Sequence, residues 1–140
     1  MVSDWLLNAR GILPDPPPDL VVPVPLHPRR LRERGFNPAA LLAQSLSRAW
    51  RVARDPVALR RLRDTPSQTL LDRRARKQNV RGAFLSRCKL PAHVCLVDDV
   101  VTTGATLEAA ARALRAGGAT RITALCAART PAPETNEPIR

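Results

Sequence analysis

Apolar residues recur along the chain in runs that alternate between strand and helix spacing. DLVVPVP (19–25) and HVCLVDDV (93–100) are β-branched runs that predict buried strands. A helix is predicted over 38–51 because Asn37 is a capping residue and leucines recur on one face; a second lies within TTGATLEAAARALRAGGA (102–119). RITALCAA (121–128) predicts a last strand. Strand, helix and strand with tight connections predict an α/β fold, with a mostly parallel sheet flanked by helices.

Turn residues and prolines divide the rest of the chain. We predict a short helix within 1–11, a Pro-rich connector over 14–18, a basic loop over 27–35, a strand over 57–63, and a short, very basic helix after Asp72. The predicted organisation is therefore an N-terminal helix and connector (1–19), one domain (20–130) and a polar, disordered tail (131–140).

Composition narrows the class of protein. The 140 residues are 44% hydrophobic and 25% charged, which is typical of one globular domain. Because the sequence has neither a long apolar run nor a basic, apolar leader, we expect a cytoplasmic protein without a membrane partner. The three cysteines form no CxxC pair and have no zinc-ligand spacing with His27 or His93, so no metal held by Cys or His and no disulfide are predicted. Cys95 and Cys126 lie in apolar runs and are expected to be buried.

The charge is concentrated in one part of the chain. The net charge is +11, and residues 27–87 contain 16 basic and 4 acidic residues. Such a segment predicts a polyanionic partner, either nucleic acid or a small ligand with several phosphates. An Arg-rich proteome would explain much of the preference for Arg over Lys, but less of the net excess.

The candidate chemistry lies in CLVDDVVTTGATLEAA (95–110). Asp98 and Asp99 fall at the predicted carboxyl end of a parallel strand, where ligands of such sheets bind. Paired carboxylates there suit the vicinal hydroxyls of a sugar, a divalent cation, or both. The following small residues open a helix, and their backbone N–H groups and hydroxyls can surround a phosphate. These loop residues are Thr102, Thr103, Gly104, Ala105 and Thr106. Together the residues predict a cradle for ribose 5-phosphate.

LVDDVVTTGATL resembles the phosphoribosyl-pyrophosphate (PRPP) signature of type I phosphoribosyltransferases. VPVPLHPRRLRERGFNPAALLA (22–43), DTPSQTLLDRRARKQNVRGAF (64–84) and the closing Ala128–Arg129–Thr130 are similar to the ComF/GntX group, the competence-protein-F-like members. The resemblance covers residues 20–130 in consistent order. No Cys-rich segment here corresponds to the N-terminal zinc ribbon with which ComF-like proteins usually begin.

The resemblance implies a glycosyltransferase, a Mg²⁺-dependent enzyme that transfers a phosphoribosyl group and releases pyrophosphate, linked to competence and DNA uptake. It implies that Asp98 and Asp99 hold the ribose hydroxyls and that the loop 102–106 binds the 5-phosphate. The loop after the first strand would face the pyrophosphate, and Arg29, Arg30 and Arg34 offer bidentate donors for it. Asp98 is the one candidate for a catalytic base.

A different function class explains the same residues. A non-catalytic module would sense PRPP or a nucleotide and bind single-stranded DNA or a DNA-processing protein. In that interpretation the basic cluster binds nucleic acid; otherwise it is part of a lid over the site. The cluster comprises Arg73, Arg74, Arg76 and Lys77. Trp5 and Trp50 are expected in the core or an interface, and a homodimer would cover any sheet face left open by the short N-terminal segment.

Overall fold

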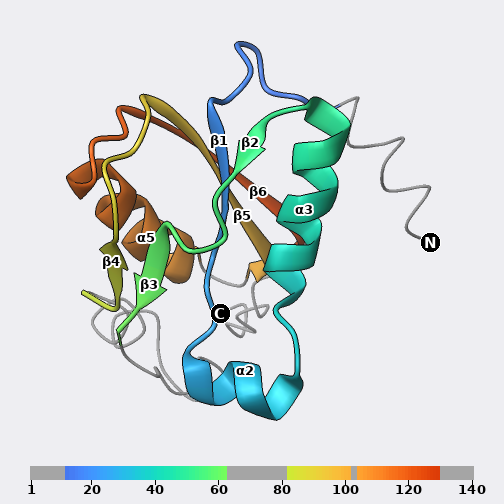
Figure 1. Cartoon of the computed structure of the whole chain (residues 1–140), viewed down its shortest axis with the longest axis vertical. Helices are drawn as coiled ribbons and strands as arrows, with labels where there is room; N and C mark the ends of the chain where they lie inside the picture. Colours follow the sequence, from blue (N-terminus) through green and yellow to red (C-terminus); the bar gives the residue numbers. More distant parts are fainter. Residues whose placement is uncertain (1–11, 63–81, 102–103, 130–140) are drawn as a thin grey trace, which may run out of the picture.

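The computed structural model describes residues 12–62, 82–101 and 104–129. Its elements, drawn in Figure 1, are β1 (Leu20–Pro23), α2 (Pro28–Arg34), α3 (Pro38–Trp50), β2 (Ala53–Arg54), β3 (Leu59–Arg61), β4 (Phe84–Ser86), β5 (His93–Val101), α5 (Ala105–Ala116) and β6 (Arg121–Arg129). The helix predicted within 1–11, the basic helix after Asp72 and the tail 131–140 lie outside the described residues. Within the described ranges, no helix is long and apolar enough to cross a membrane.

Four parallel strands form the central sheet in the order β2-β1-β5-β6. Val21 is paired with Cys95, and Leu96 is paired with Ala124. β3 and β4 form a separate antiparallel pair, the β3–β4 hairpin. In Figure 1, α3 lies on one side of the sheet, and α5 and this hairpin lie on the other. The predicted α/β fold, a parallel sheet flanked by helices, is therefore confirmed.

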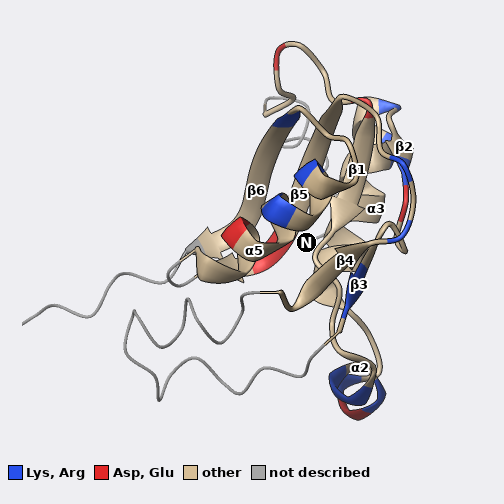
Figure 2. Cartoon of the chain, turned by 90° about the vertical axis from the view of Figure 1, so that its left-hand side faces the viewer, with Lys and Arg blue, Asp and Glu red and all other residues tan. Residues whose placement is uncertain are grey.

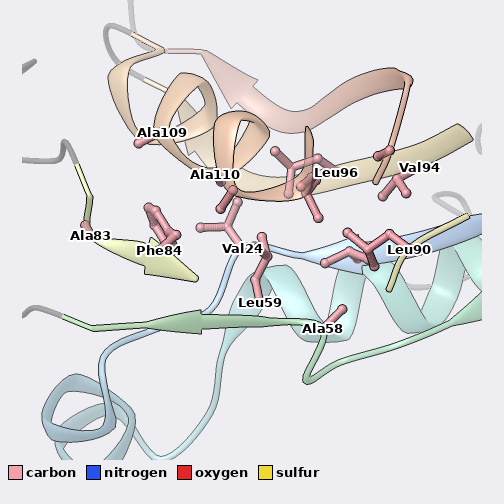
Figure 3. Packing of buried hydrophobic residues seen from close by; sticks show 14 of the residues in the cluster. Val24, Ala58, Leu59, Ala83, Phe84, Leu90, Val94, Leu96, Ala109 and Ala110 are labelled. Carbon is pink, nitrogen blue, oxygen red and sulfur yellow. The ribbon is translucent and has the colours of Figure 1, made fainter. Parts of the chain in front are cut away.

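Two apolar cores form because successive strand residues face opposite sides of the sheet. The core under α3 contains the odd-numbered strand residues, together with Leu46 and Trp50 of the helix; the strand members are Val21, Cys95 and Val97. The other core contains Val22, Val24, Val94 and Leu96 with residues of α5 and the hairpin (Figure 3). Burial on both faces explains why these strands are continuously apolar. Trp50 is in the core, as predicted.

The basic segment after β1 differs from its prediction. Residues 27–35 were predicted to be a loop, but they form α2, which begins after His27 and ends at Gly35. His27 Nδ1 accepts a hydrogen bond from the Arg29 N–H at 3.2 Å, and Pro28 occupies the first helical position. Arginine is a good helix former and proline is well tolerated there, so local propensity favours the helix. The prediction was wrong because it treated dense charge as a loop signal.

Three smaller differences concern the sheets. The predicted strand at 57–63 is shorter, because β3 covers Leu59–Arg61, and the two-residue β2 was not predicted. Cys95 is buried as expected, and burial raises the pKa of its thiol to about 12. Cys126 is exposed, contrary to its prediction, because β6 is the outer strand of the described sheet. The apolar run around it does not distinguish a central strand from an outer one.

Candidate functional site

The acid pair lies where the sheet narrows. Pairing of β1 with β5 ends at Pro23 and Val97, whereas β6 continues beside β5 as far as Val101. Asp98 and Asp99 follow Val97, so they lie at the carboxyl-terminal edge of β1 but inside β5. The predicted strand, 93–100, already included both aspartates, and β5 continues one residue further, to Val101, where β6 still pairs with it. Figure 2 shows the acidic end of β5 beside the start of α5.

The two carboxyl groups interact with each other at the end of β5. Val94 and Leu96 face α5 and the hairpin, whereas Val97 faces α3. Continuing this alternation places Asp98 on the hairpin side, where Arg61 of β3 acts on it. Both residues are half-buried, and the Asp99 N–H donates to Asp98 Oδ1 at 2.8 Å. The pair can therefore contact a ligand that lies across the end of β5.

Asp98 has a strongly perturbed acidity. Its pKa is raised from 3.8 to about 7, chiefly because burial disfavours the charged form. The side-chain hydrogen bond and the charge of Asp99 raise it further, whereas the Asp99 backbone N–H and the positive charge of Arg61 lower it. A carboxyl group that titrates near neutrality can exchange a proton at physiological pH.

Arg61 is a site residue that the sequence analysis missed. It ends β3 and is paired with Phe84 across the hairpin, and its guanidinium carbon lies 5.3 Å from the centroid of the Phe84 ring. Contact with an aromatic face orients a guanidinium group and is modestly stabilising. This places a positive charge close enough to act on Asp98. Only the pairing of residues 59–61 with 84–86 brings Arg61 to the site, and no local pattern indicates that pairing.

The predicted phosphate loop is described from Gly104 onward. Gly104 has φ +80° and ψ 0° and precedes α5, whose Glu108 N–H donates to the Gly104 carbonyl at 2.9 Å. A Cβ built on Gly104 would meet no described atom within 4 Å, so the space above it is open. Ala105 is buried and Thr106 is half-buried in the first turn, where backbone N–H groups favour an anion. Thr102 and Thr103 lie outside the described residues.

The arginines predicted to bind pyrophosphate are all on α2, which Figure 2 shows as a strongly basic helix. Arg30 and Arg34 are four residues apart and share one side of the helix. Arg29 lies on another side, where its Nε is 3.4 Å from Glu33 Oε1 in an exposed ion pair. The structure thus brings two of the three predicted residues to one side. Arg73, Arg74, Arg76 and Lys77 lie outside the described residues.

Comparison with known proteins agrees with this fold. The family model described as "Phosphoribosyl transferase domain" matches residues 33–138, so the chain belongs to that family. A purine phosphoribosyltransferase from Pyrococcus horikoshii Ot3 is structurally similar, with a TM-score of 0.58, 20% sequence identity, and coverage of 93% of this chain and 73% of that one. This likeness confirms the type I phosphoribosyltransferase fold.

Curated relatives show which group within the family this chain resembles. The chain is 44% identical over 116 residues to the DNA utilization protein YhgH of Escherichia coli strain K12, covering 81% of this chain and 50% of the relative. It is 38% identical over 109 residues to competence protein F of Haemophilus influenzae, covering 75% and 48%. The predicted similarity to the competence-protein-F-like group is therefore confirmed. The chain spans about half the length of these relatives.

Proposed function

We propose that this domain binds PRPP and catalyses Mg²⁺-dependent transfer of its phosphoribosyl group to a nucleophile, with release of pyrophosphate. One observation carries the proposal: an acid pair at the sheet edge is followed by a left-handed glycine and the open first turn of α5. Acceptors for vicinal hydroxyls and donors for a phosphate are then separated by only a few residues. Ribose 5-phosphate has both kinds of group, hydroxyls and a phosphate, on one small molecule.

Each group has a role in this proposal. Asp98 and Asp99 accept hydrogen bonds from the ribose hydroxyls, and the loop 102–106 binds the 5-phosphate. Arg30 and Arg34 bind pyrophosphate, with Arg29 contributing once its exposed ion pair with Glu33 opens. The C1–oxygen bond breaks, and pyrophosphate leaves with the bonding electrons. The nucleophile then bonds to C1 and gives its proton to the Asp98 carboxylate, which is suited to this by its pKa near 7.

The acid pair also fits a divalent cation. Mg²⁺ prefers carboxylate oxygens and substrate phosphates as ligands. The raised pKa of Asp98 indicates that nearby positive charge does not fully balance the negative charge of this site. Asp98 and Asp99 are the residues that would hold the ion together with PRPP. When bound, Mg²⁺ would neutralise charge that develops on pyrophosphate.

The proposal predicts that PRPP binding depends on both aspartates. Asp98→Asn/Asp99→Asn should weaken PRPP binding in the presence of Mg²⁺ by ten-fold or more, because hydrogen bonds to charged acceptors contribute about 1.5–3 kcal/mol. Isothermal titration calorimetry measures the affinity, and circular dichroism checks the fold. Asp15→Asn, which changes an exposed carboxyl of the connector, is the matched control. Unchanged PRPP affinity in a folded double variant would exclude this site.

Catalysis must be tested separately from binding, because a PRPP sensor and a phosphoribosyltransferase would both need the same PRPP-binding residues. Pyrophosphate release should be followed with PRPP, Mg²⁺ and a panel of nucleobases and nucleosides. Release that depends on one acceptor and is lost in the double variant supports transfer. PRPP binding without release for any acceptor supports the sensing module instead.

A second candidate function is binding of single-stranded DNA or a DNA-processing protein. α2 supports it, because this helix has four arginines and one glutamate and, against the described part of the chain, buries none of its residues. The names of the relatives, DNA utilization protein and competence protein F, are consistent with such a partner. A homodimer, expected from the sequence as cover for an open sheet face, stays a proposal, although helices lie on both sides of the described sheet (Figure 1).

Binding of a single-stranded oligonucleotide tests the second candidate. Affinity should fall steeply with salt, because each neutralised phosphate of a single strand contributes about −0.7 to the log–log slope. Charge reversal at Arg73, Arg74 and Arg76 should reduce this affinity and the slope while PRPP affinity is unchanged. Equal loss of PRPP and DNA would instead make this cluster part of a lid over the PRPP site.

A further inference from the structure

An exposed aromatic ring lies beside the basic helix. Phe36 connects α2 to α3 and is 49% exposed, whereas Phe84, the other phenylalanine of the chain, is only 7% exposed. Leu31 of α2 and Leu41 of α3 are also exposed. All three lie within residues 31–41, and exposed large apolar side chains commonly indicate a binding surface. We call Leu31, Phe36 and Leu41, with α2, the α2–Phe36 surface.

The backbone on both sides of Phe36 is held in place. Before it, the Gly35 N–H donates to the Leu31 carbonyl at 2.8 Å and ends α2. After it, Asn37 Oδ1 accepts from the Ala39 N–H at 3.1 Å and begins α3. Phe36 therefore lies between two capped helix ends. The backbone at Phe36 therefore loses little conformational freedom when a ligand stacks on the ring.

Hydrogen bonds place this ring at the same edge of the sheet as the acid pair. Asn37 Nδ2 donates to the Val24 carbonyl at 3.0 Å, and the Val24 N–H donates to the Val97 carbonyl at 2.8 Å. Val97 immediately precedes Asp98. The α2–Phe36 surface thus borders the candidate PRPP site through a short backbone connection.

Charge identifies the kind of ligand. In α2 four arginines outnumber the single Glu33, whose ion pair with Arg29 is exposed. Arg32 and Arg34 are exposed and precede Phe36 by four and two residues. A free nucleobase has no phosphate for these arginines, whereas a nucleic acid strand has one at every nucleotide. Arginines with an exposed aromatic ring are the combination that binds single strands.

We propose that Phe36 is a stacking platform for an unpaired base of single-stranded nucleic acid, whose flanking phosphates are bound by the arginines of α2. This inference rests on the second candidate function and assigns it to specific residues. It adds a contact at the edge of the PRPP site to the one proposed for the cluster at 73–77. A strand bound there would bring its bases close to the proposed reaction centre.

The test separates stacking from phosphate contacts. The probes are a fluorescently labelled 20-mer of thymidylate and an abasic 20-mer with the same phosphates, and anisotropy measures binding. Phe36→Ala should weaken binding of the thymidylate oligomer roughly ten-fold and leave binding of the abasic oligomer unchanged, because base–aromatic stacking is lost. Phe36→Trp should preserve thymidylate binding. Leu85→Ala, which removes an exposed apolar side chain from β4, is the matched control and should alter neither affinity.

Two results would overturn the platform. One is an equal loss of affinity for both oligomers in Phe36→Ala; the other is no loss for either. In both cases, binding by the wild-type chain leaves the second candidate function intact. If the wild-type chain binds neither oligomer, that function fails together with the platform. PRPP titration of Phe36→Ala, expected to match the wild type, shows that the variant is folded.

Discussion

Replacing Asp98 with asparagine is expected to stabilise the unliganded protein at pH 8, on the order of 2–4 kcal/mol in the free energy of unfolding. The carboxyl group has a pKa of about 7 in the folded chain, against its ordinary value of 3.8, so the fold disfavours its ionised form. An amide resembles the protonated form, and its oxygen can still accept the hydrogen bond from the Asp99 N–H. The side chain proposed to bind ligand therefore destabilises the empty site.

The raised pKa of Asp98 also predicts how the free energy of unfolding changes with pH. Because the pKa of Asp98 is raised by folding, the folded state binds more protons than the unfolded state between about pH 4 and pH 7. Stability of the wild-type chain should therefore fall as pH rises through this window. In Asp98→Asn that contribution is absent, so the two proteins should differ little near pH 4 and most at pH 8.

Urea unfolding, followed by the fluorescence of the buried Trp50, measures this difference across the pH range. Asp15→Asn removes the same unit of charge from an exposed position, and it should stay within about 0.5 kcal/mol of the wild type. If the Asp98→Asn variant is less stable than the wild type at pH 8, the fold does not disfavour the ionised form of Asp98.

Gly104→Val is expected to abolish binding of ribose 5-phosphate at the start of α5. Gly104 has φ +80°, which costs an L residue about 1–2 kcal/mol and a β-branched residue more. The new side chain would also occupy the open space where the proposed phosphate lies. In the wild type, ribose 5-phosphate should slow hydrogen exchange of the amides in the first turn of α5. In the variant this protection should be lost and the affinity should fall by more than ten-fold.

Gly35→Val is a control for backbone strain. Gly35 also has φ +80° and no described atom within 4 Å of an added Cβ, but it ends α2 and lies away from the proposed phosphate loop. Its valine variant should lose a similar amount of stability and keep the protection by ribose 5-phosphate. Persistent protection in Gly104→Val would mean that the phosphate binds elsewhere.

The sequence by itself determined the main elements and their order. Runs of β-branched residues marked β1 and β5, Asn37 and Pro38 marked the start of α3, and the small residues after Asp99 marked the start of α5. These signals are local, since strand burial, helix capping and left-handed turns each depend on residues close together in the chain. For the same reason the acid pair and the proposed phosphate loop were found as one continuous motif.

Tertiary structure alone decided which distant residues meet and which sides are covered. Arg61 acts on Asp98 because β3 pairs with β4, and Cys126 is exposed because β6 is the outer strand of the described sheet. Phe36 is exposed because nothing in the described chain covers the corner between α2 and α3. An apolar residue has the same local pattern whether or not another element packs on it. Its exposure, and so the surface that it offers to a partner, is set only when the elements assemble.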